Sequence, residues 1–94
     1  MVLRDNPDEL RYELLVDGEV VGELRYRLRP DAVALIHTEV PEAFEGRGYG
    51  GQLVEGALDD LRRRGLKIVP ICPFVRGYLQ RHPEYGDLVV ERAR

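Results

Sequence analysis

Apolar and polar positions alternate in two segments near the start of the chain, residues 11–16 and 20–28. A period of two is typical of a strand with one buried face. Asp17-Gly18 stands between the segments, and this dipeptide is a strong signal for a two-residue hairpin turn. We therefore expect two antiparallel strands. In the second strand the predicted apolar face consists of Val20, Gly22, Leu24, Tyr26 and Leu28, with Val21 on the opposite face.

A third strand is expected from Val33 to Val40, where the pattern alternates again. Leu35, His37 and Glu39 share one predicted face of this strand, and Thr38 lies on the other. The far end of the strand is therefore polar on both faces. The first ten residues of the chain show no comparable pattern.

An amphipathic helix is predicted from about Gly48 to Arg64. Its apolar positions recur at helical spacing, and Gly65 stands where a left-handed C-cap is expected. Residues 66–72 then form an apolar run broken only by Lys67, which favours a buried strand parallel to the one before the helix. The connection between two such strands is expected to be a right-handed crossover.

Pro70 lies inside this second parallel strand. Because proline cannot donate to a ladder, it is disfavoured in a central strand unless pairing has already ended there. The two parallel strands are thus expected to splay near their C-terminal ends and to leave a gap for a ligand. Pro73 can open a short helix from Phe74 to about Arg81, with Cys72 at its N-terminal end. Residues 88–90 are predicted to form a last strand.

The turn before the first helix is rich in glycine, with Gly46, Gly48, Gly50 and Gly51 close together. Glycine permits positive φ and leaves no Cβ to keep a ligand away. The first turn of the following helix adds unpaired N–H groups and a dipole, so the turn suits an anion such as a pyrophosphate. The glycine spacing matches the dinucleotide fingerprint G-x-G-x-x-G, but its structural context does not. No strand ends directly before the turn, and no acidic residue ends the next strand. A turn that binds no ligand is the alternative interpretation.

Composition limits the classes of function. The chain has 94 residues, of which 33% are charged, and a net charge of −3 with both signs interspersed. Without a basic field we expect no binding to nucleic acid or to an anionic membrane, and no apolar run approaches the ~20 residues of a membrane span. Cys72 is the single cysteine. We therefore expect no internal disulfide and no metal site, and a cytoplasmic location fits best.

The segments EGRGYGG and IVPICPFVRGYLQRHPEY carry a resemblance to a known family. Together with the strand before them, they resemble the GNAT superfamily of acetyl-coenzyme A-dependent N-acetyltransferases, and more narrowly its minimal single-domain YjdJ-type branch. The resemblance implies one domain over residues 1–94 of α/β (α+β) class. Its expected form is a GNAT-like mixed sheet, with antiparallel N-terminal strands followed by a β-α-β unit with splayed parallel strands and a short C-terminal helix. The family's phosphate motif falls on Glu45, Gly48 and Gly50, where Glu45 departs from the usual Gln or Arg.

The resemblance also implies acetyl-coenzyme A as cosubstrate and an amine, on a small molecule or a protein, as acceptor. The pantetheine arm is expected between the splayed strands, beside the backbone of Glu39 and Val40, and the Val40 N–H is the expected donor to the carbonyl oxyanion. Arg47 can supply a positive charge to the turn. The backbone N–H groups expected to hold the pyrophosphate are those of Arg47, Gly48, Tyr49, Gly50 and Gly51.

Acetyl transfer also requires a base for the amine and an acid for the departing thiolate. Glu39 or His37, acting directly or through water, is the candidate base, and the alternative is that both are only polar strand residues. Cys72 is either a small buried hydrophobe or a thiol stabilised as thiolate by the following helix, able to assist the leaving group or to accept the acetyl group briefly.

Most GNAT enzymes carry a tyrosine in the last helix as general acid. Here Leu79 or Gln80 falls at that place, with Tyr78 adjacent, so the acid is unassigned. Tyr78 and Tyr85 are interpreted as core aromatics rather than as catalytic residues.

Typical GNAT domains place one or two helices between their first two strands, and the Asp17-Gly18 turn leaves no room for them. The acceptor side is therefore expected to be open, or to be completed by a partner or by a second subunit in a homodimer. The predicted function is N-acetyl transfer by direct attack in a ternary complex. The alternatives are a coenzyme A-binding sensor or interaction module with little turnover, and an adaptor that binds no cofactor.

Overall fold

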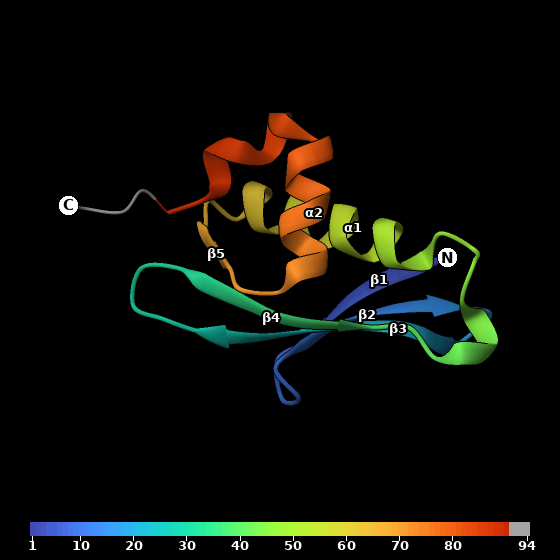
Figure 1. Ribbon diagram of the computed structural model, residues 1–94. Helices are drawn as coiled ribbons and strands as arrows, with labels where there is room; N and C mark the ends of the chain where they lie inside the picture. The colour runs from blue at the N-terminus through green and yellow to red at the C-terminus, as the bar shows by residue number, and fades with distance from the viewer. Residues whose placement is uncertain (91–94) are drawn as a thin grey trace.

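The computed structural model describes residues 1–90, which form a five-stranded sheet with two α-helices packed together on one of its faces (Figure 1). The strands lie side by side in chain order, antiparallel from β1 to β4, and β5 is parallel to β4. The expected mixed sheet and β-α-β unit are confirmed. The elements are β1 (Val2–Asn6), β2 (Arg11–Val16), β3 (Glu19–Leu28), β4 (Val33–Glu39), the 3₁₀ turn η1 (Glu42–Phe44), α1 (Tyr49–Arg63), β5 (Ile68–Pro70), α2 (Pro73–Arg81) and the 3₁₀ segment η2 (Pro83–Leu88).

β1 is a strand that the hydrophobic pattern did not reveal. It pairs with β2 along its whole length, but Leu3 is its one residue packed against the core. That side chain fits against Gly56 of α1, where an added Cβ would lie 3.0 Å from Leu3 Cδ2. Arg4 and Asn6 instead donate hydrogen bonds to Glu13 on the neighbouring strand. A strand with so few apolar positions has no period to detect.

Two β-bulges change which residues face the core. In β3 the bulge leaves Val21 as the extra residue, because Leu14 pairs with Gly22 and Leu15 with Val20. Val21 is consequently buried, so its predicted outward orientation was wrong. Leu28, predicted on the apolar face of the same strand, is 67% exposed.

The second bulge lies in β4 at Ile36, between the pairs Arg25–His37 and Tyr26–Leu35. Leu35 belongs to the core, whereas His37 and Glu39 are largely exposed. The prediction that Leu35 shares a face with these two polar residues was therefore wrong. The bulge has this effect because one extra residue inverts the alternation of every later side chain.

α1 and α2 agree with the helices predicted from the sequence to within one residue at each end. α1 is held to the sheet by its fully buried apolar stripe, and Gly65 has a φ of +72°, as the left-handed C-cap requires. Tyr78 and Tyr85 are buried, which confirms them as core aromatics. The stripe of α1 consists of Leu53, Val54, Ala57, Leu58 and Leu61.

The chain after α1 departs from the prediction in two places. β5 covers only Ile68–Pro70, within the longer strand predicted at residues 66–72. The predicted last strand is reduced to one bridge between Val89 and Ile68, because η2 extends through Leu88. The Val90 N–H donates to the Ile68 carbonyl oxygen at 2.9 Å, so this end of the described chain borders β5.

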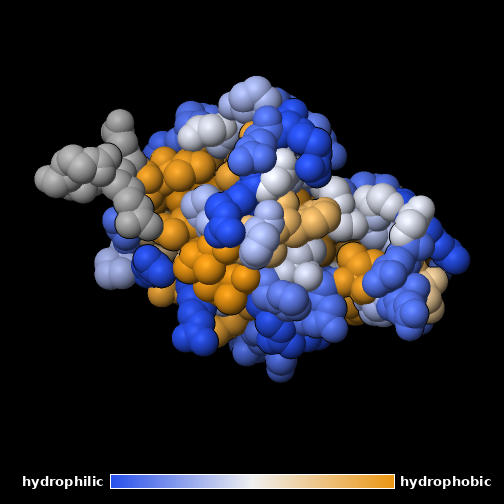
Figure 2. Space-filling model, in the orientation of Figure 1, coloured by the Kyte–Doolittle hydropathy of each residue, from blue (hydrophilic) through white to orange (hydrophobic). Residues whose placement is uncertain are grey.

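The face of the sheet opposite α1 and α2 carries neither α-helix of the described residues (Figure 1). Within residues 1–90 no helix is both long and apolar enough to cross a membrane. In Figure 2 apolar surface gathers on the side of the molecule that carries β5, and Leu28 and Ile71 are among the exposed apolar side chains.

Candidate active site

The parallel ladder between β4 and β5 ends half-way along β4. Leu35 and Pro70 form its last pair. The Leu35 carbonyl oxygen then accepts the N–H groups of Ile71 and Cys72, at 3.0 and 2.9 Å, as the chain turns away into α2. β4 continues to Glu39 without a strand partner on this side among the described residues. The predicted splay is confirmed, and it leaves backbone groups of β4 for a ligand to meet.

The glycine turn follows β4 and η1 and lies directly before α1. Gly46 and Gly48 have φ values of +82° and +78°, a conformation that glycine adopts without strain. Gly48 is the N-cap of α1 and provides no side-chain cap, so first-turn N–H groups are left for another partner. A Cβ added at Gly46, Gly48 or Gly51 would meet no atom within 4 Å. The space over the turn is therefore open to an anion.

Aromatic side chains support the turn from both ends. The Arg47 guanidinium lies over the Phe44 ring, 6.0 Å from its centroid, a distance at which a cation is attracted to the ring face. On the other side, an added Cβ at Gly50 would lie 2.9 Å from Cζ of Phe74. The absence of a side chain at Gly50 thus lets Phe74, at the start of α2, lie against the start of α1.

Cys72 is the N-cap of α2 and is 3% exposed. Its sulfur lies 3.4 Å from the hydroxyl oxygen of Thr38, across the gap between the splayed strands. Burial raises the pKa of the Cys72 thiol, but hydrogen bonds from Thr38 and from the backbone N–H groups of Val75 and Phe74 outweigh it and lower the pKa from its ordinary value. Burial and a lowered thiol pKa therefore occur together at Cys72, and the choice between a packing role and a catalytic role stays a prediction.

His37 and Glu39 lie on the other face of the sheet. Their side chains are 59% and 62% exposed, and Nε2 of His37 is 3.7 Å from Oε1 of Glu39. The prediction that the two residues share a face is confirmed. The predicted catalytic residues do not form one cluster, since Cys72 contacts the helix side of β4 and this pair faces the helix-free side.

Thr38 is a residue of the candidate site that sequence reasoning named only as a strand position. Its contact with Cys72 depends on the bulge at Ile36 and on the turn into α2.

Glu13, outside the candidate site, was also missed: it is 1% exposed and accepts hydrogen bonds from Arg4, Asn6 and Arg11. A charged residue inside an alternating strand was the available signal in the sequence.

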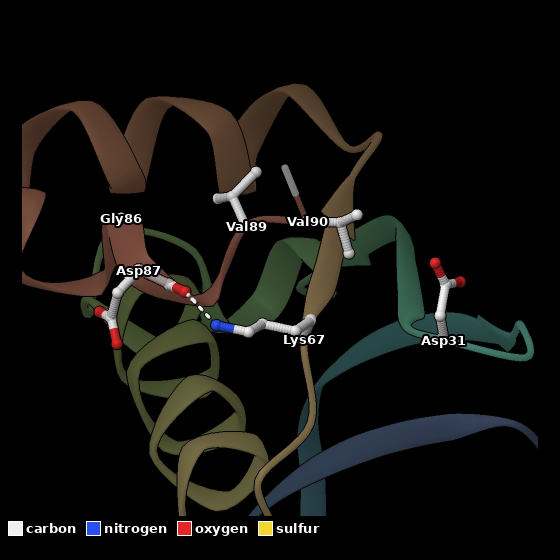
Figure 3. A pocket seen from close by; sticks show the side chains of 6 residues that line it. All are labelled: Asp31, Lys67, Gly86, Asp87, Val89 and Val90. Atoms are coloured by element: carbon white, nitrogen blue, oxygen red, sulfur yellow. Dashed lines mark hydrogen bonds between the residues drawn. The ribbon is translucent and has the colours of Figure 1, made fainter. Parts of the chain in front are cut away.

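A wide hollow of about 730 Å³ lies at the opposite end of β4 from the glycine turn (Figure 3). It is bordered by Asp31, which precedes β4, and by Lys67, which precedes β5 and donates to the Asp87 carbonyl oxygen at 2.8 Å. Ligands of open α/β sheets bind outside the carboxyl ends of the strands, whereas this hollow lies at their amino ends. Residues 1–90 also contain no group of three or more acidic, histidine or cysteine side chains placed to hold a metal ion.

Comparison with protein families identifies the fold's relatives. Residues 11–88 match the model of the family described as GCN5-related N-acetyl-transferase. The chain belongs to this family. The enzyme class expected from the sequence, an N-acetyltransferase, is that of the family. Acetyl-coenzyme A and an acceptor are the ligands expected for a GCN5-related N-acetyltransferase.

Solved structures show the same fold. A GCN5-like protein from Staphylococcus aureus solved by NMR superposes with a TM-score of 0.70 at 21% identity, covering 99% of this chain and 91% of that one. The ribosomal-protein-alanine N-acetyltransferase of Brucella melitensis biovar Abortus 2308 superposes with a TM-score of 0.58 at 19% identity, covering 89% of this chain and 64% of that one.

Among curated relatives of this GCN5-related N-acetyltransferase are Protein NATD1 of Xenopus tropicalis and of Homo sapiens. Each is 39% identical over 51 residues, or 54% of this chain, and the match covers 47% and 45% of the two relatives. The match thus spans about half the length of these relatives.

Proposed function

We propose that this protein transfers the acetyl group of acetyl-coenzyme A to an amine by direct attack in a ternary complex. The observation that carries the proposal is the early end of the β4–β5 ladder at Leu35 and Pro70, together with an open glycine turn before α1. Unpaired backbone groups along β4 suit a thioester arm, and N–H donors without side chains over them suit a diphosphate. The contact of Phe74, at the start of α2, with Gly50 links the two features.

The backbone from Arg47 to Gly51 would hold the diphosphate. The open space over Gly46, Gly48 and Gly51 fits this group, because no protein atom lies where a Cβ would point. Arg47 adds a positive charge that offsets Glu45, whose side chain must point away from the phosphates. The backbone of Glu39 and Val40 would pair with the pantetheine arm along the free edge of β4. Acetyl-coenzyme A supplies a thioester whose carbonyl carbon is open to attack by an amine.

Glu39 or His37 would receive the proton of the attacking amine, directly or through water. As the amine nitrogen forms its bond to the acetyl carbon, the carbon–sulfur bond breaks and coenzyme A leaves as a thiolate that takes up a proton. The Val40 N–H would donate to the carbonyl oxygen as its negative charge develops. Both acid–base candidates lie on the helix-free face, so the amine would approach from that side.

Cys72 would stand on the other side of β4, in the gap. The lowered pKa of its thiol and its contact with Thr38 support a role close to the departing sulfur. In the direct attack it would assist the leaving thiolate by donating the proton of its thiol. It would act from the side of β4 opposite the base.

A thermal shift with acetyl-coenzyme A tests the proposal. A ligand present at about 100 times its dissociation constant adds roughly 2.7 kcal/mol to the free energy of unfolding. The proposal predicts this stabilisation, together with release of coenzyme A when amines are supplied. A melting temperature unchanged by saturating acetyl-coenzyme A would contradict it.

The second candidate function is a coenzyme A-binding sensor or interaction module with little turnover. The observation that favours it is the helix-free face, because no α-helix of residues 1–90 closes around an acceptor there. This candidate predicts the thermal shift but no release of coenzyme A with any amine or protein. Measuring binding and release on the same preparation therefore separates the two functions.

A further inference from the structure

Charged side chains cover the helix-free face of the sheet, and many of them form ion pairs with one another. Glu13 is bound by Arg4 and Arg11, at 2.5 and 2.7 Å. Glu23 is bound by Arg11 and Arg25, at 2.9 and 2.8 Å. These five residues form one continuous network across β1, β2 and β3. Each of the five has an oppositely charged partner, and with three arginines and two glutamates the network carries a net charge of +1.

Arg27 and Glu39 do not belong to this network, and neither does Glu9. Arg27 points the same way as Arg25, two residues earlier in β3, and makes no ion pair or side-chain hydrogen bond within residues 1–90. Glu39 has His37 as its ion-pair neighbour, at 3.7 Å, and that pair is ionic only when the imidazole is protonated. Arg27 can therefore attract an anionic group of a ligand, and Glu39 a cationic one.

Each of these two residues lines a hollow of its own. A hollow of about 290 Å³ contains Glu39, Glu23 and Arg25. A second hollow of about 320 Å³ contains Arg27, Arg25 and the bulge residue Ile36, with Glu9 also on its wall. Arg25 borders both hollows, so they adjoin, and its cross-strand partner is His37. Of the two candidate bases, Glu39 lines the first hollow, and His37 lies 3.7 Å from Glu39.

The spacing of the two charges excludes a free amino acid as the ligand that joins them. Glu39 pairs with Glu23, which lies four positions before Arg27 on β3. At a rise of about 3.3 Å per residue this is a separation of roughly 13 Å along the strand. The amine and the carboxylate of a free amino acid are separated by a single carbon. An extended peptide covers the same distance in about four residues.

We propose that the acceptor is an amine on a polypeptide that carries an acidic side chain about four residues away. The amine enters the hollow at Glu39, beside His37, and the acidic side chain meets Arg27 in the adjoining hollow. Hollows walled by strands suit single side chains, while the open sheet face accommodates the chain between them. This inference rests on the proposed acetyl transfer and names its substrate class.

The test uses the full chain and a set of end-capped peptides that are otherwise uncharged. Each has one lysine and, four residues before or after it, either glutamate or glutamine, and release of coenzyme A is the readout. An exposed ion pair is worth up to about 1 kcal/mol, so we expect kcat/KM to be about five-fold higher for a glutamate peptide. Arg27→Gln should remove the preference, and Arg27→Glu should reverse it.

Arg29→Gln is the matched control, because Arg29 is an exposed arginine in the turn after β3 and lines neither hollow. It should keep the preference of the wild type. Equal rates with both peptides in the wild type, or an unchanged preference in Arg27→Gln, overturn the inference. A wild type that binds acetyl-coenzyme A but acetylates none of the peptides also overturns it and leaves the proposed function standing. A wild type that does not bind acetyl-coenzyme A overturns both.

Discussion

The hydroxyl oxygen of Thr38 lies 3.4 Å from the sulfur of Cys72. Thr38 belongs to the half of β4 that has lost its parallel partner, and Cys72 is the N-cap of α2. The contact therefore links β4 to the start of α2 on the helix side of the sheet, next to the edge of β4 where we propose that the thioester lies. It also contributes to the lowered pKa of the thiol.

Replacing Cys72 tests whether this thiol takes part in transfer. We expect Cys72→Ala to lower kcat about ten-fold, a loss of about 1.4 kcal/mol in transition-state stabilisation, with little change in the affinity for acetyl-coenzyme A. Cys72→Ser keeps a partner for Thr38 but lacks an ionisable thiol, so it should be as slow as the alanine variant. A kcat equal to that of the wild type in both variants would show that the thiol only fills space.

His37 and Glu39 are tested together, because either could accept the proton. Loss of a general base typically costs about 10²- to 10⁴-fold in rate, so we expect this loss in the double variant His37→Asn/Glu39→Gln and a smaller loss in each single variant. Both side chains are exposed, so the melting temperature should change little. A double variant with wild-type kcat/KM would show that these are ordinary strand residues.

The contact between Gly50 and Phe74 predicts a coupling in stability. Gly50→Ala places a methyl carbon about 2.9 Å from Cζ of Phe74, a residue that is 43% exposed and whose ring must shift, so we expect a cost of about 1 kcal/mol, at the low end for overpacking. In a Phe74→Ala background the same change should instead stabilise α1 by up to about 1 kcal/mol, since alanine is the better helix former. Urea unfolding of the four proteins in this cycle measures the difference. Equal effects of Gly50→Ala in both backgrounds would contradict the packing described here.

Glu13 predicts how stability depends on pH. Burial raises the pKa of this carboxyl, but hydrogen bonds from Arg4, Arg11 and Asn6 outweigh it and lower the pKa to about 2 from an ordinary value of 4.5. A pKa that is lower in the folded state stabilises the fold fully above pH 4.5, and this stabilisation is lost as the pH falls toward about 2. The urea concentration at the midpoint of unfolding should therefore decrease as the pH is lowered from 5 to 3.

Glu13→Gln is the comparison for this pH series. It breaks a buried ionic network, so we expect a loss on the order of 3 kcal/mol at pH 7. Below pH 4.5 the variant should lose less further stability than the wild type, because it has no carboxyl to protonate at this position. Parallel losses in the two proteins would mean that Glu13 contributes nothing to the acid sensitivity.

The features predicted correctly from the sequence depend on local signals. The glycine turn, the stripe of α1 and the disruption at Pro70 can each be recognised within a few neighbouring residues, because φ preferences, helical periodicity and the missing proline N–H act locally. The fold class followed from these features together with the family resemblance.

The features that were missed depend on cross-strand register. A bulge is defined by two strands at once, so the extra residues Val21 and Ile36 cannot be identified from either strand alone. For the same reason the sequence did not reveal that Leu35 faces away from His37 and Glu39, or that Thr38 meets Cys72. β1 was missed because it is defined by its partners rather than by its own pattern.

The affinity of Gly48→Val for acetyl-coenzyme A tests the central claim most directly. Gly48 and Gly18 have nearly equal positive φ values, +78° and +79°, and an added Cβ at either would meet no atom within 4 Å. Valine at either site thus imposes a similar backbone strain of about 1–3 kcal/mol, but only Gly48 lies in the turn that we propose holds the diphosphate. By isothermal titration, we predict that Gly18→Val binds as the wild type does and that Gly48→Val loses at least about ten-fold in affinity, or about 1.4 kcal/mol. Equal affinities in the wild type, Gly18→Val and Gly48→Val would contradict the claim that this turn holds the diphosphate.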